Sequence, residues 1–323
     1  MFYNLLFPFA EQFPLLNIFQ YITVRSGGAL VTALLLSWLF GPWMIAHFRK
    51  MQVHYKTVRE DLPARHAETK TGTPSMGGVM IYGTIAVATL LWADLTNGYV
   101  WLTLGAVTAF ALTGFWDDFL KMSGRRRQGL AGKWRLFIGL VVSLAVVFVL
   151  GEVLAAPEAY NVFVPFVKEM SLPLGLWGFA VFGFFVIVGT TNAVNLTDGL
   201  DGLATVPALI AAGTFGLIAY IVGRADFTDY LYVQHVPGTA ELTIFCMAVV
   251  GACLGFLWFN APPAQIFMGD TGSLTLGSSL GVVAVLTKHE LHLAIIGGLF
   301  VIEALSSIVQ VASYKTTGRR VFL

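Results

Sequence analysis

Carboxylates that could bind a metal ion stand beside apolar segments of this sequence. Asp117 and Asp118 are adjacent, and neighbouring carboxylates repel each other unless a cation or a shared proton lies between them. Mg²⁺ suits such a pair, because it takes one or two protein carboxylates and completes its shell with water and phosphate oxygens. Three further aspartates also stand beside apolar segments: Asp198, Asp201 and Asp270. A metal site that receives a diphosphate substrate is the chemistry that we expect.

Cations and glycine-rich backbone lie close to these acids and could contact phosphate. Lys70 and Lys133 are near expected helix ends and are the better candidates for phosphate contacts. The arginines at 125–127 are interpreted instead as a topology signal. Glycines let backbone N–H groups approach an anion closely. Three glycine-rich segments precede apolar segments: 72–78, 198–202 and 269–273.

The composition indicates a membrane protein. Of the 323 residues, 57% are hydrophobic and 11% are charged, against about 25% charged residues in ordinary soluble domains. The mean hydropathy of +0.76 is hard to reconcile with the polar shell of a soluble domain. The net charge of +1 argues against nucleic acid as a partner, because such binding depends on clustered Lys and Arg. Cys246 and Cys253 share one apolar stretch, so we expect buried thiols and neither a disulfide nor a zinc site.

Nine apolar segments are candidates for membrane-spanning helices, since about 20 apolar residues cross about 30 Å of hydrocarbon. They are approximately 26–48, 75–93, 97–116, 136–151, 172–190, 202–223, 242–259, 271–287 and 291–314. The sequence therefore predicts an all-α, polytopic transmembrane helical bundle that forms one integral membrane catalytic domain, 1–323. The apolar N-terminal stretch is interrupted by Pro8, Glu11 and Pro14, and we expect it to lie at the membrane interface.

Basic residues predict the orientation of the bundle, because Lys and Arg are retained on the cytoplasmic side. With the N-terminus outside, 15 of the 19 Lys and Arg residues fall in three cytoplasmic segments: 49–74, 117–135 and 315–323. The five aspartates then all lie at the mouths of spans on that side. One such aspartate is readily explained as a solvated helix end, but five on one face favour a common active site facing the cytoplasm.

Five stretches of sequence contain most of these polar residues. They are KTGTPSMGG from Lys70, GFWDDFLK from Gly114, TNAVNLTDGLDGLA from Thr191, GFLWFNAPPAQIFMGDTGSL from Gly255 and TGRRVFL from Thr317. Together they resemble the polyprenyl-phosphate N-acetylhexosamine-1-phosphate transferase superfamily. The GTPSMGG, NAPPAQIFMGD and TGRRVFL stretches are typical of its phospho-N-acetylmuramoyl-pentapeptide-transferase branch. The resemblance extends from about Arg59 to the last residue.

The resemblance implies a Mg²⁺-dependent transferase of the bacterial cytoplasmic (inner) membrane. Its expected substrates are UDP-N-acetylmuramoyl-pentapeptide and undecaprenyl phosphate. Transfer of the phosphosugar to the lipid would release UMP and form lipid I, the first lipid-linked precursor of peptidoglycan. The lipid bilayer is therefore itself an expected partner, and a homodimer is one assembly that the resemblance leaves open.

The resemblance and the needs of phosphoryl transfer also suggest roles for single residues. Asp270 is the first choice for the Mg²⁺ ligand, Asp118 a direct or water-mediated ligand, and Asp117 the group that orients or activates the lipid phosphate. A scheme in which an aspartate first forms a covalent phosphosugar intermediate stays open. Substrate contacts are expected at Lys70, Lys133, Asn195, Asp198, Gly199, Leu200, Asp201, Asn260 and Phe267, with Ser75 and Gln310 as weaker assignments.

The match to the branch departs from its pattern at the C-terminal side. In the branch, TGRRVFL is normally followed by a Met-Ala-Pro-Ile-His-His-His loop and a tenth span, whereas this sequence stops at Leu323. Nine spans are thus expected where the family has ten. Because those histidines belong to the family's active site, inactivity of the chain as given is a further expectation.

Two other functions compete with this interpretation. A sibling transferase would use UDP-N-acetylglucosamine and would share the superfamily motifs. A secondary transporter of anionic nucleotide sugars would also be a multi-span bundle, but its polar residues should lie near the middle of the membrane. The polar residues here gather at one face, which disfavours transport.

The distribution of basic residues predicts which loops react from each side of the membrane. With Ser123→Cys, labelling by a membrane-impermeant maleimide should occur only from the cytoplasm, and with Tyr160→Cys only from outside. Right-side-out and inverted vesicles provide the two comparisons, and the unsubstituted protein is the control. The reverse pattern would overturn the orientation and the argument for one cytoplasmic site.

Overall fold

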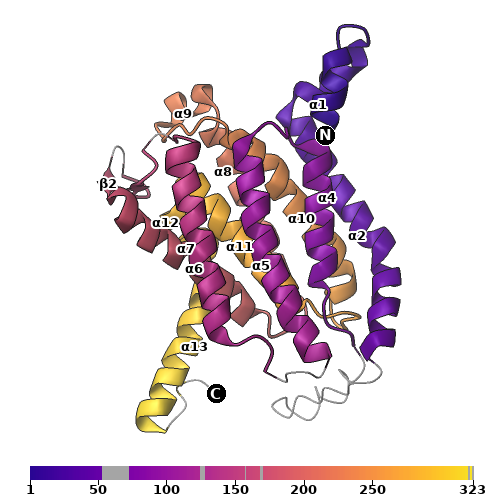
Figure 1. Cartoon of the computed structure of the whole chain (residues 1–323), viewed down its shortest axis with the longest axis vertical. Helices are drawn as coiled ribbons and strands as arrows, with labels where there is room; N and C mark the ends of the chain where they lie inside the picture. The colour runs from indigo at the N-terminus through magenta and orange to yellow at the C-terminus, as the bar shows by residue number, and fades with distance from the viewer. Residues whose placement is uncertain (53–72, 124–127, 157, 168–169, 319–320, 322–323) are drawn as a thin grey trace.

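The computed structural model describes the chain apart from residues 53–72, 124–127, 157, 168–169, 319–320 and 322–323. The described part is a helical bundle with one small β-hairpin (Figure 1). Its α-helices are α1 (Phe2–Leu6), α2 (Ile22–Gln52), α4 (Gly78–Trp92), α5 (Gly98–Met122), α6 (Gly132–Phe148), α7 (Gly175–Thr197), α8 (Thr205–Val222), α9 (Ala225–Leu231), α10 (Leu242–Asn260), α11 (Gly269–Leu286), α12 (Glu290–Ile296) and α13 (Gly298–Thr317). The all-α prediction is confirmed.

Short elements join the longer helices. They are the 3₁₀ turns η1 (Phe7–Phe9), η2 (Pro14–Gln20) and η4 (Thr239–Glu241), the π-helical turn η3 (Val149–Val153), and the strands β1 (Asn161–Phe163) and β2 (Ser171–Pro173). The two strands pair antiparallel, with Val162 opposite Leu172. Helices dominate because segments this apolar, placed in a bilayer, must satisfy every backbone N–H and C=O within the protein.

A helix lies at each of the nine positions expected for a span, but fewer of them are membrane-spanning by length and composition. Six qualify among the described residues: α2, α5, α6 with η3, α7, α8 and η4 with α10. The bent pair of α12 and α13 gives a seventh if it forms one span, and the two helices meet at 83°. Helix α4 has only 15 residues, and α11 is less apolar than the six. By length and composition, six or seven of the nine expected spans are therefore supported among the described residues, and α4 and α11 stay predicted spans.

Helix α11 is less apolar because other helices surround it. Every residue from Thr271 to Leu286 is buried, and α11 packs against α4, α5, α7 and α8. Its hydroxyl groups bond to carbonyls of the preceding turn: Thr275 Oγ1 donates to Thr271 O at 2.6 Å, and Ser279 Oγ donates to Thr275 O at 2.7 Å. A helix that faces protein on all sides does not need the composition of a lipid-facing span.

Glycines allow α4 and α5 to approach the first turns of α11 at backbone contact distance. A Cβ atom on Gly78 of α4 would lie 1.9 Å from the backbone nitrogen of Gly272, and one on Gly114 of α5 would lie 2.4 Å from the carbonyl oxygen of Asp270. Small residues at helix interfaces in membranes permit such close packing. The beginning of α11 is thus held between the beginning of α4 and the end of α5.

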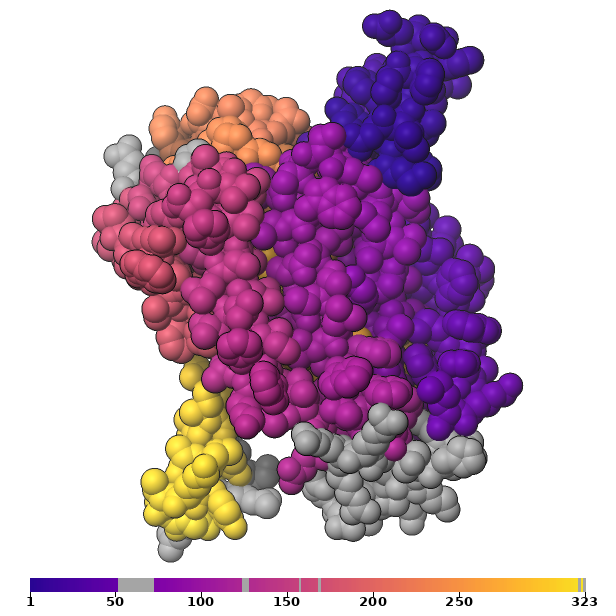
Figure 2. Space-filling model, in the orientation of Figure 1, coloured from indigo at the N-terminus to yellow at the C-terminus, as the bar shows by residue number. Residues whose placement is uncertain are grey.

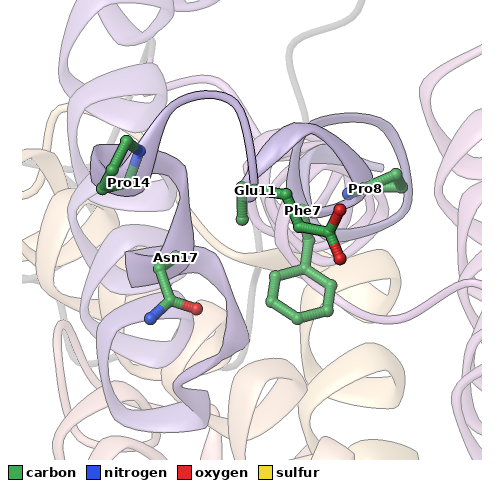
Figure 3. Close-up of a pocket in the computed structure, with 6 residues that line it drawn as sticks. Phe7, Pro8, Glu11, Pro14 and Asn17 are labelled. Atoms are coloured by element: carbon green, nitrogen blue, oxygen red, sulfur yellow. The ribbon is translucent and has the colours of Figure 1, made fainter.

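The N-terminal segment projects from one end of the bundle, and α13 projects from the other (Figure 2). A pocket in the N-terminal segment is lined by Phe7, Pro8, Ala10, Glu11, Pro14 and Asn17 (Figure 3). Glu11 is the one charged side chain of that lining. This pocket lies at the end of the bundle opposite to the end of α5 (Figure 1), so it does not contain the predicted chemistry. The interfacial position of this segment stays a prediction.

The close approach of α4 to α11 predicts a stability difference between two glycines of the same helix. Gly78→Ala should lower the thermal unfolding temperature in detergent, because overpacking typically costs about 1–3 kcal/mol. Gly83→Ala is the matched control, since a Cβ there meets no atom within 4 Å and alanine favours a helix. Equal unfolding temperatures for the two variants would contradict the described contact between α4 and α11.

Candidate active site

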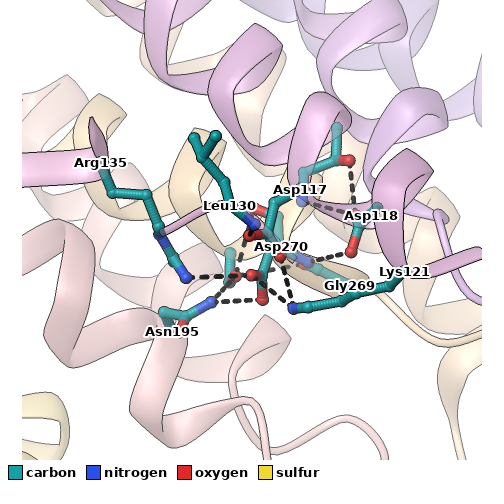
Figure 4. Close-up of polar contacts among 10 residues, drawn as sticks. Asp117, Asp118, Lys121, Leu130, Arg135, Asn195, Gly269 and Asp270 are labelled. Atoms are coloured by element: carbon teal, nitrogen blue, oxygen red, sulfur yellow. Dashed lines mark hydrogen bonds and ion pairs between the residues drawn. The ribbon is translucent and has the colours of Figure 1, made fainter. Parts of the chain in front are cut away.

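Three of the predicted aspartates meet where α5 ends and α11 begins (Figure 4). Asp117 and Asp118 are buried on α5, and Asp270 is half-buried in the first turn of α11. One carboxylate oxygen from each lies within 4.8 Å of the others. The predicted convergence of these acids is therefore present in the structure, although Asp270 stands about 150 positions after the other two.

Two cations bind these carboxylates. Lys121 Nζ lies 2.5 Å from Asp117 Oδ2 and 2.9 Å from Asp270 Oδ2. Arg135 of α6 places a guanidinium nitrogen 3.3 Å from Asp270 Oδ2. Both residues belong to the basic segment 117–135, from which the sequence pattern predicted only Lys133 as a phosphate contact. The spacing of Lys121 four residues after Asp117 was an available signal, because such residues share a helix face.

Backbone and amide donors fix the orientation of two of the acids. The backbone N–H of Leu130 donates to Asp117 Oδ1 at 2.7 Å. Asn195 Nδ2 donates to Asp270 Oδ1 at 3.0 Å and to Ser273 Oγ at 2.7 Å. Asn195, at the end of α7, was predicted as a substrate contact, and the structure brings it into the cluster.

Asp118 is bonded differently from the other two acids. Its Oδ1 accepts the backbone N–H of Asp270 at 3.0 Å, and its Oδ2 accepts the backbone N–H and the hydroxyl of Thr271 at 2.8 and 2.6 Å. All three donors belong to the first turn of α11. Asp118 therefore supplies the acceptors that a helix requires at its N-terminus.

The glycine-rich segment 72–78 is joined by backbone hydrogen bonds to residues 267 and 268, which directly precede the glycine-rich segment 269–273. The N–H of Phe267 donates to Pro74 O, the N–H of Gly77 donates to Phe267 O, and the N–H of Gly78 donates to Met268 O, at 2.8 to 2.9 Å. Ser75 and Phe267, both half-buried, therefore lie on paired segments that lead into α4 and α11.

Asn260 connects the loop after α7 with the segment before α11. Its Oδ1 accepts the backbone N–H of Gly202 at 3.0 Å and the hydroxyl of Thr205 at 3.3 Å, while its Nδ2 donates to Ile266 O at 3.0 Å. The residue is buried. These bonds organise the loops, and a direct contact of Asn260 with a substrate stays a prediction.

The remaining predicted residues are spread around this centre. Asp198 ends α7, and the loop after it contains Gly199 and Leu200, both exposed, and Asp201, which is half-buried. Lys133 is exposed in the first turn of α6. Gln310 lies on the projecting α13, and its Oε1 accepts the backbone N–H of Val321 at 3.0 Å. Lys70 lies outside the described residues.

The donor set of the cluster fits a hard divalent cation. Its ligand atoms are carboxylate oxygens, which Mg²⁺ prefers. Asp117 Oδ2 is buried and, among the described residues, accepts no hydrogen bond beyond its ion pair with Lys121. A metal ion or a phosphate-bound cation could therefore take the place of the Lys121 ammonium beside this oxygen.

Comparisons with known proteins show the family of the chain. The sequence profile described as glycosyl transferase family 4 matches residues 100–288, a range that contains all three acids, both cations and Asn195. A phospho-N-acetylmuramoyl-pentapeptide-transferase from Granulibacter bethesdensis (strain ATCC BAA-1260 / CGDNIH1) is 53% identical over 323 residues, which cover 100% of this chain and 89% of that protein. The resemblance found in the sequence is confirmed, and the chain belongs to glycosyl transferase family 4 and to its phospho-N-acetylmuramoyl-pentapeptide-transferase branch.

Proposed function

We propose that this membrane protein transfers phospho-N-acetylmuramoyl-pentapeptide from its UDP-linked donor to undecaprenyl phosphate, releasing UMP and forming lipid I. The observation that carries the proposal is the meeting of Asp117, Asp118 and Asp270 with Lys121 and Arg135 at the ends of α5 and α11. Phosphoryl transfer depends mainly on positioning and on neutralising charge. A cluster that combines carboxylates for a metal ion with cations for phosphate oxygens supplies both.

The reaction consists of an exchange of one phosphorus–oxygen bond. A phosphate oxygen of the lipid attacks the phosphorus that carries the sugar, and the bond from that phosphorus to UMP breaks. A phosphate monoester has a second pKa of about 6, so the acceptor is mostly dianionic at neutral pH and needs no strong base. This supports a one-step transfer, while attack by an aspartate to form a covalent intermediate remains the alternative.

Asp270 is the proposed principal ligand for Mg²⁺. Asp117 Oδ2 is a better candidate than Asp118 for the second ligand atom. Asp118 was predicted as a ligand, but both of its oxygens accept hydrogen bonds from α11. When bound, Mg²⁺ would neutralise charge on the diphosphate. Lys121 and Arg135 are placed to donate to phosphate oxygens, and such charge-assisted hydrogen bonds are strong.

The uridine nucleotide is proposed to bind along the loops that surround the acids. Asn195 donates a hydrogen bond to Asp270, and Phe267 precedes Asp270 by three residues in the sequence. The half-buried ring of Phe267 could stack on uracil. Asp198, Gly199, Leu200, Asp201, Asn260 and Lys70 complete the proposed nucleotide contacts, with Ser75, Lys133 and Gln310 as further candidates.

The proposed site faces the cytoplasm of a bacterial inner membrane. The end of α5 and the start of α6, which contain Asp117, Asp118 and Arg135, belong to one of the three basic segments. A UDP-linked donor is a polar molecule of the cytosol, whereas a polyprenyl acceptor stays in the bilayer. Helix ends at the inner interface are where both can meet. Homodimerisation stays a prediction.

The choice of sugar nucleotide tests the proposal most directly. Radiolabelled UDP-N-acetylmuramoyl-pentapeptide and UDP-N-acetylglucosamine are each supplied with undecaprenyl phosphate and Mg²⁺ in detergent. Label should enter the lipid fraction only from the muramoyl-pentapeptide donor. Incorporation from UDP-N-acetylglucosamine alone would identify the sibling transferase instead.

Replacing the proposed metal ligand should remove turnover. Asp270→Asn keeps the size of the side chain but removes the charge that binds a hard cation, so Mg²⁺-dependent activity should fall by several orders of magnitude. Asp226→Asn is the control, because Asp226 is an exposed partner of Arg224 outside the cluster. More than about a tenth of the activity left in Asp270→Asn, which corresponds to roughly 1.4 kcal/mol, would remove Asp270 as principal ligand.

A further inference from the structure

Helix α11 lacks a capping residue of its own. Its first turn begins at Gly269, and the preceding residue, Met268, provides no side-chain hydrogen bond. The early N–H groups of a helix have no partner within the helix and are usually bonded by a Ser, Thr, Asp or Asn that precedes it. Here the acceptor comes from α5, because Asp118 binds the N–H groups of Asp270 and Thr271.

The capping contact acts on the residue that carries the proposed metal ligand. The backbone N–H of Asp270 is fixed by Asp118 Oδ1, and the side chain of the same residue extends to Lys121 and Asn195. Gly269 has φ +73°, and a Cβ there would lie 2.7 Å from Asp118 Oδ2, so Asp118 lies directly against the turn. The position of the Asp270 carboxylate therefore depends on the Asp118 contact.

The bonds already made by Asp118 leave little capacity for a metal ion. Oδ2 accepts two hydrogen bonds, from the N–H and the hydroxyl of Thr271, and Oδ1 accepts one. A carboxylate oxygen offers about two lone-pair positions. Oδ2 is therefore fully used, whereas Asp117 Oδ2 accepts no hydrogen bond from the backbone of the described residues and is held by the ammonium of Lys121.

We infer that Asp118 is a positioning residue, which caps α11 and thereby aims the Asp270 carboxylate at the metal ion, and that it is not itself a metal ligand. This inference rests on the proposed function of Asp270 as the principal Mg²⁺ ligand. It assigns different roles to two adjacent aspartates: Asp117 faces the reacting groups, and Asp118 faces the backbone of α11.

A substitution at Thr271 distinguishes a positioning role of Asp118 from a role as metal ligand. The Thr271 hydroxyl donates to Asp118 Oδ2, and the two roles predict opposite effects of its loss on metal binding. Thr271→Val removes the hydroxyl but keeps the shape and the backbone donors. If Asp118 positions Asp270, the loss of this bond weakens metal binding. If Asp118 is a ligand, the change frees an oxygen and leaves metal binding equal or tighter. Thr271→Ser retains the hydroxyl and is the matched control.

The experiment uses Mn²⁺ alone as the probe, with the electron paramagnetic resonance signal of the free ion reporting its affinity for the detergent-solubilised protein. Thr271→Val should weaken Mn²⁺ binding about tenfold or more, the scale of one hydrogen bond to a charged group, and Thr271→Ser should stay near the unsubstituted value. Thermal unfolding verifies that each variant is folded. In Asp118→Asn, an amide group that cannot accept hydrogen bonds replaces one of the two oxygens bonded to α11. Adding Thr271→Val to this variant should not weaken Mn²⁺ binding further, because both changes act on one contact.

The outcomes are distinguishable from each other and from a failure of the proposed function. Unchanged or tighter Mn²⁺ binding by Thr271→Val, or additive losses in the double variant, would overturn the positioning role. If Asp118→Asn does not fold, the comparison of Thr271→Val with Thr271→Ser decides alone. The binding assay contains neither substrate, so an error in the proposed sugar nucleotide leaves its result valid. Normal Mn²⁺ binding by Asp270→Asn would overturn both the metal assignment and the role of Asp118.

Discussion

The contact between the end of α5 and the first turn of α11 determines where the charged groups of the site lie. Asp117, Asp118 and Lys121 are all on the last turns of α5, and Asp270 is on the first turn of α11. Glycines at positions 78 and 114 bring α4 and α5 against the backbone of α11. Because these are backbone contacts, the three helices cannot shift past one another without large rearrangement. Backbone hydrogen bonds between residues 74–78 and 267–268 fix the loops before α4 and α11 relative to each other.

Charge balance is the second constraint on the site. Three carboxylates in a largely buried place repel one another, and burying unpaired charge is expensive. Lys121 and Arg135 offset part of this repulsion in the structure. Under the proposed function, a metal ion would share Asp270 with Lys121, and the phosphates of the substrates would offer Lys121 and Arg135 further partners. The same cations then serve both the stability of the cluster and the binding of anions.

The sequence predicted the helices and the convergence of the acids, because both follow from one-dimensional patterns. Apolar runs mark nine helical segments, and the topology predicted from the basic segments places Asp117, Asp118 and Asp270 at one face. The break between α12 and α13, at Gly297 and Gly298, was missed because both halves are apolar and glycine inside a span does not by itself indicate a bend. The direction of each carboxylate was also missed. The four-residue spacing indicates the pair of Asp117 and Lys121, but nothing in the adjacent aspartates shows that Asp118 faces α11, since that depends on how two distant helices pack.

The burial of α11 also has a consequence for how the chain enters the membrane. A segment with this many glycines, serines and threonines gains less from transfer into lipid than the six more apolar helices. Its polar groups are compatible with the bilayer only because protein surrounds them on every side. We therefore expect insertion of α11 during biosynthesis to rely on partner helices that are already in place. Helices α4, α5, α7, α8 and α10 all precede α11 in the chain, so they are synthesised before the helix that they surround.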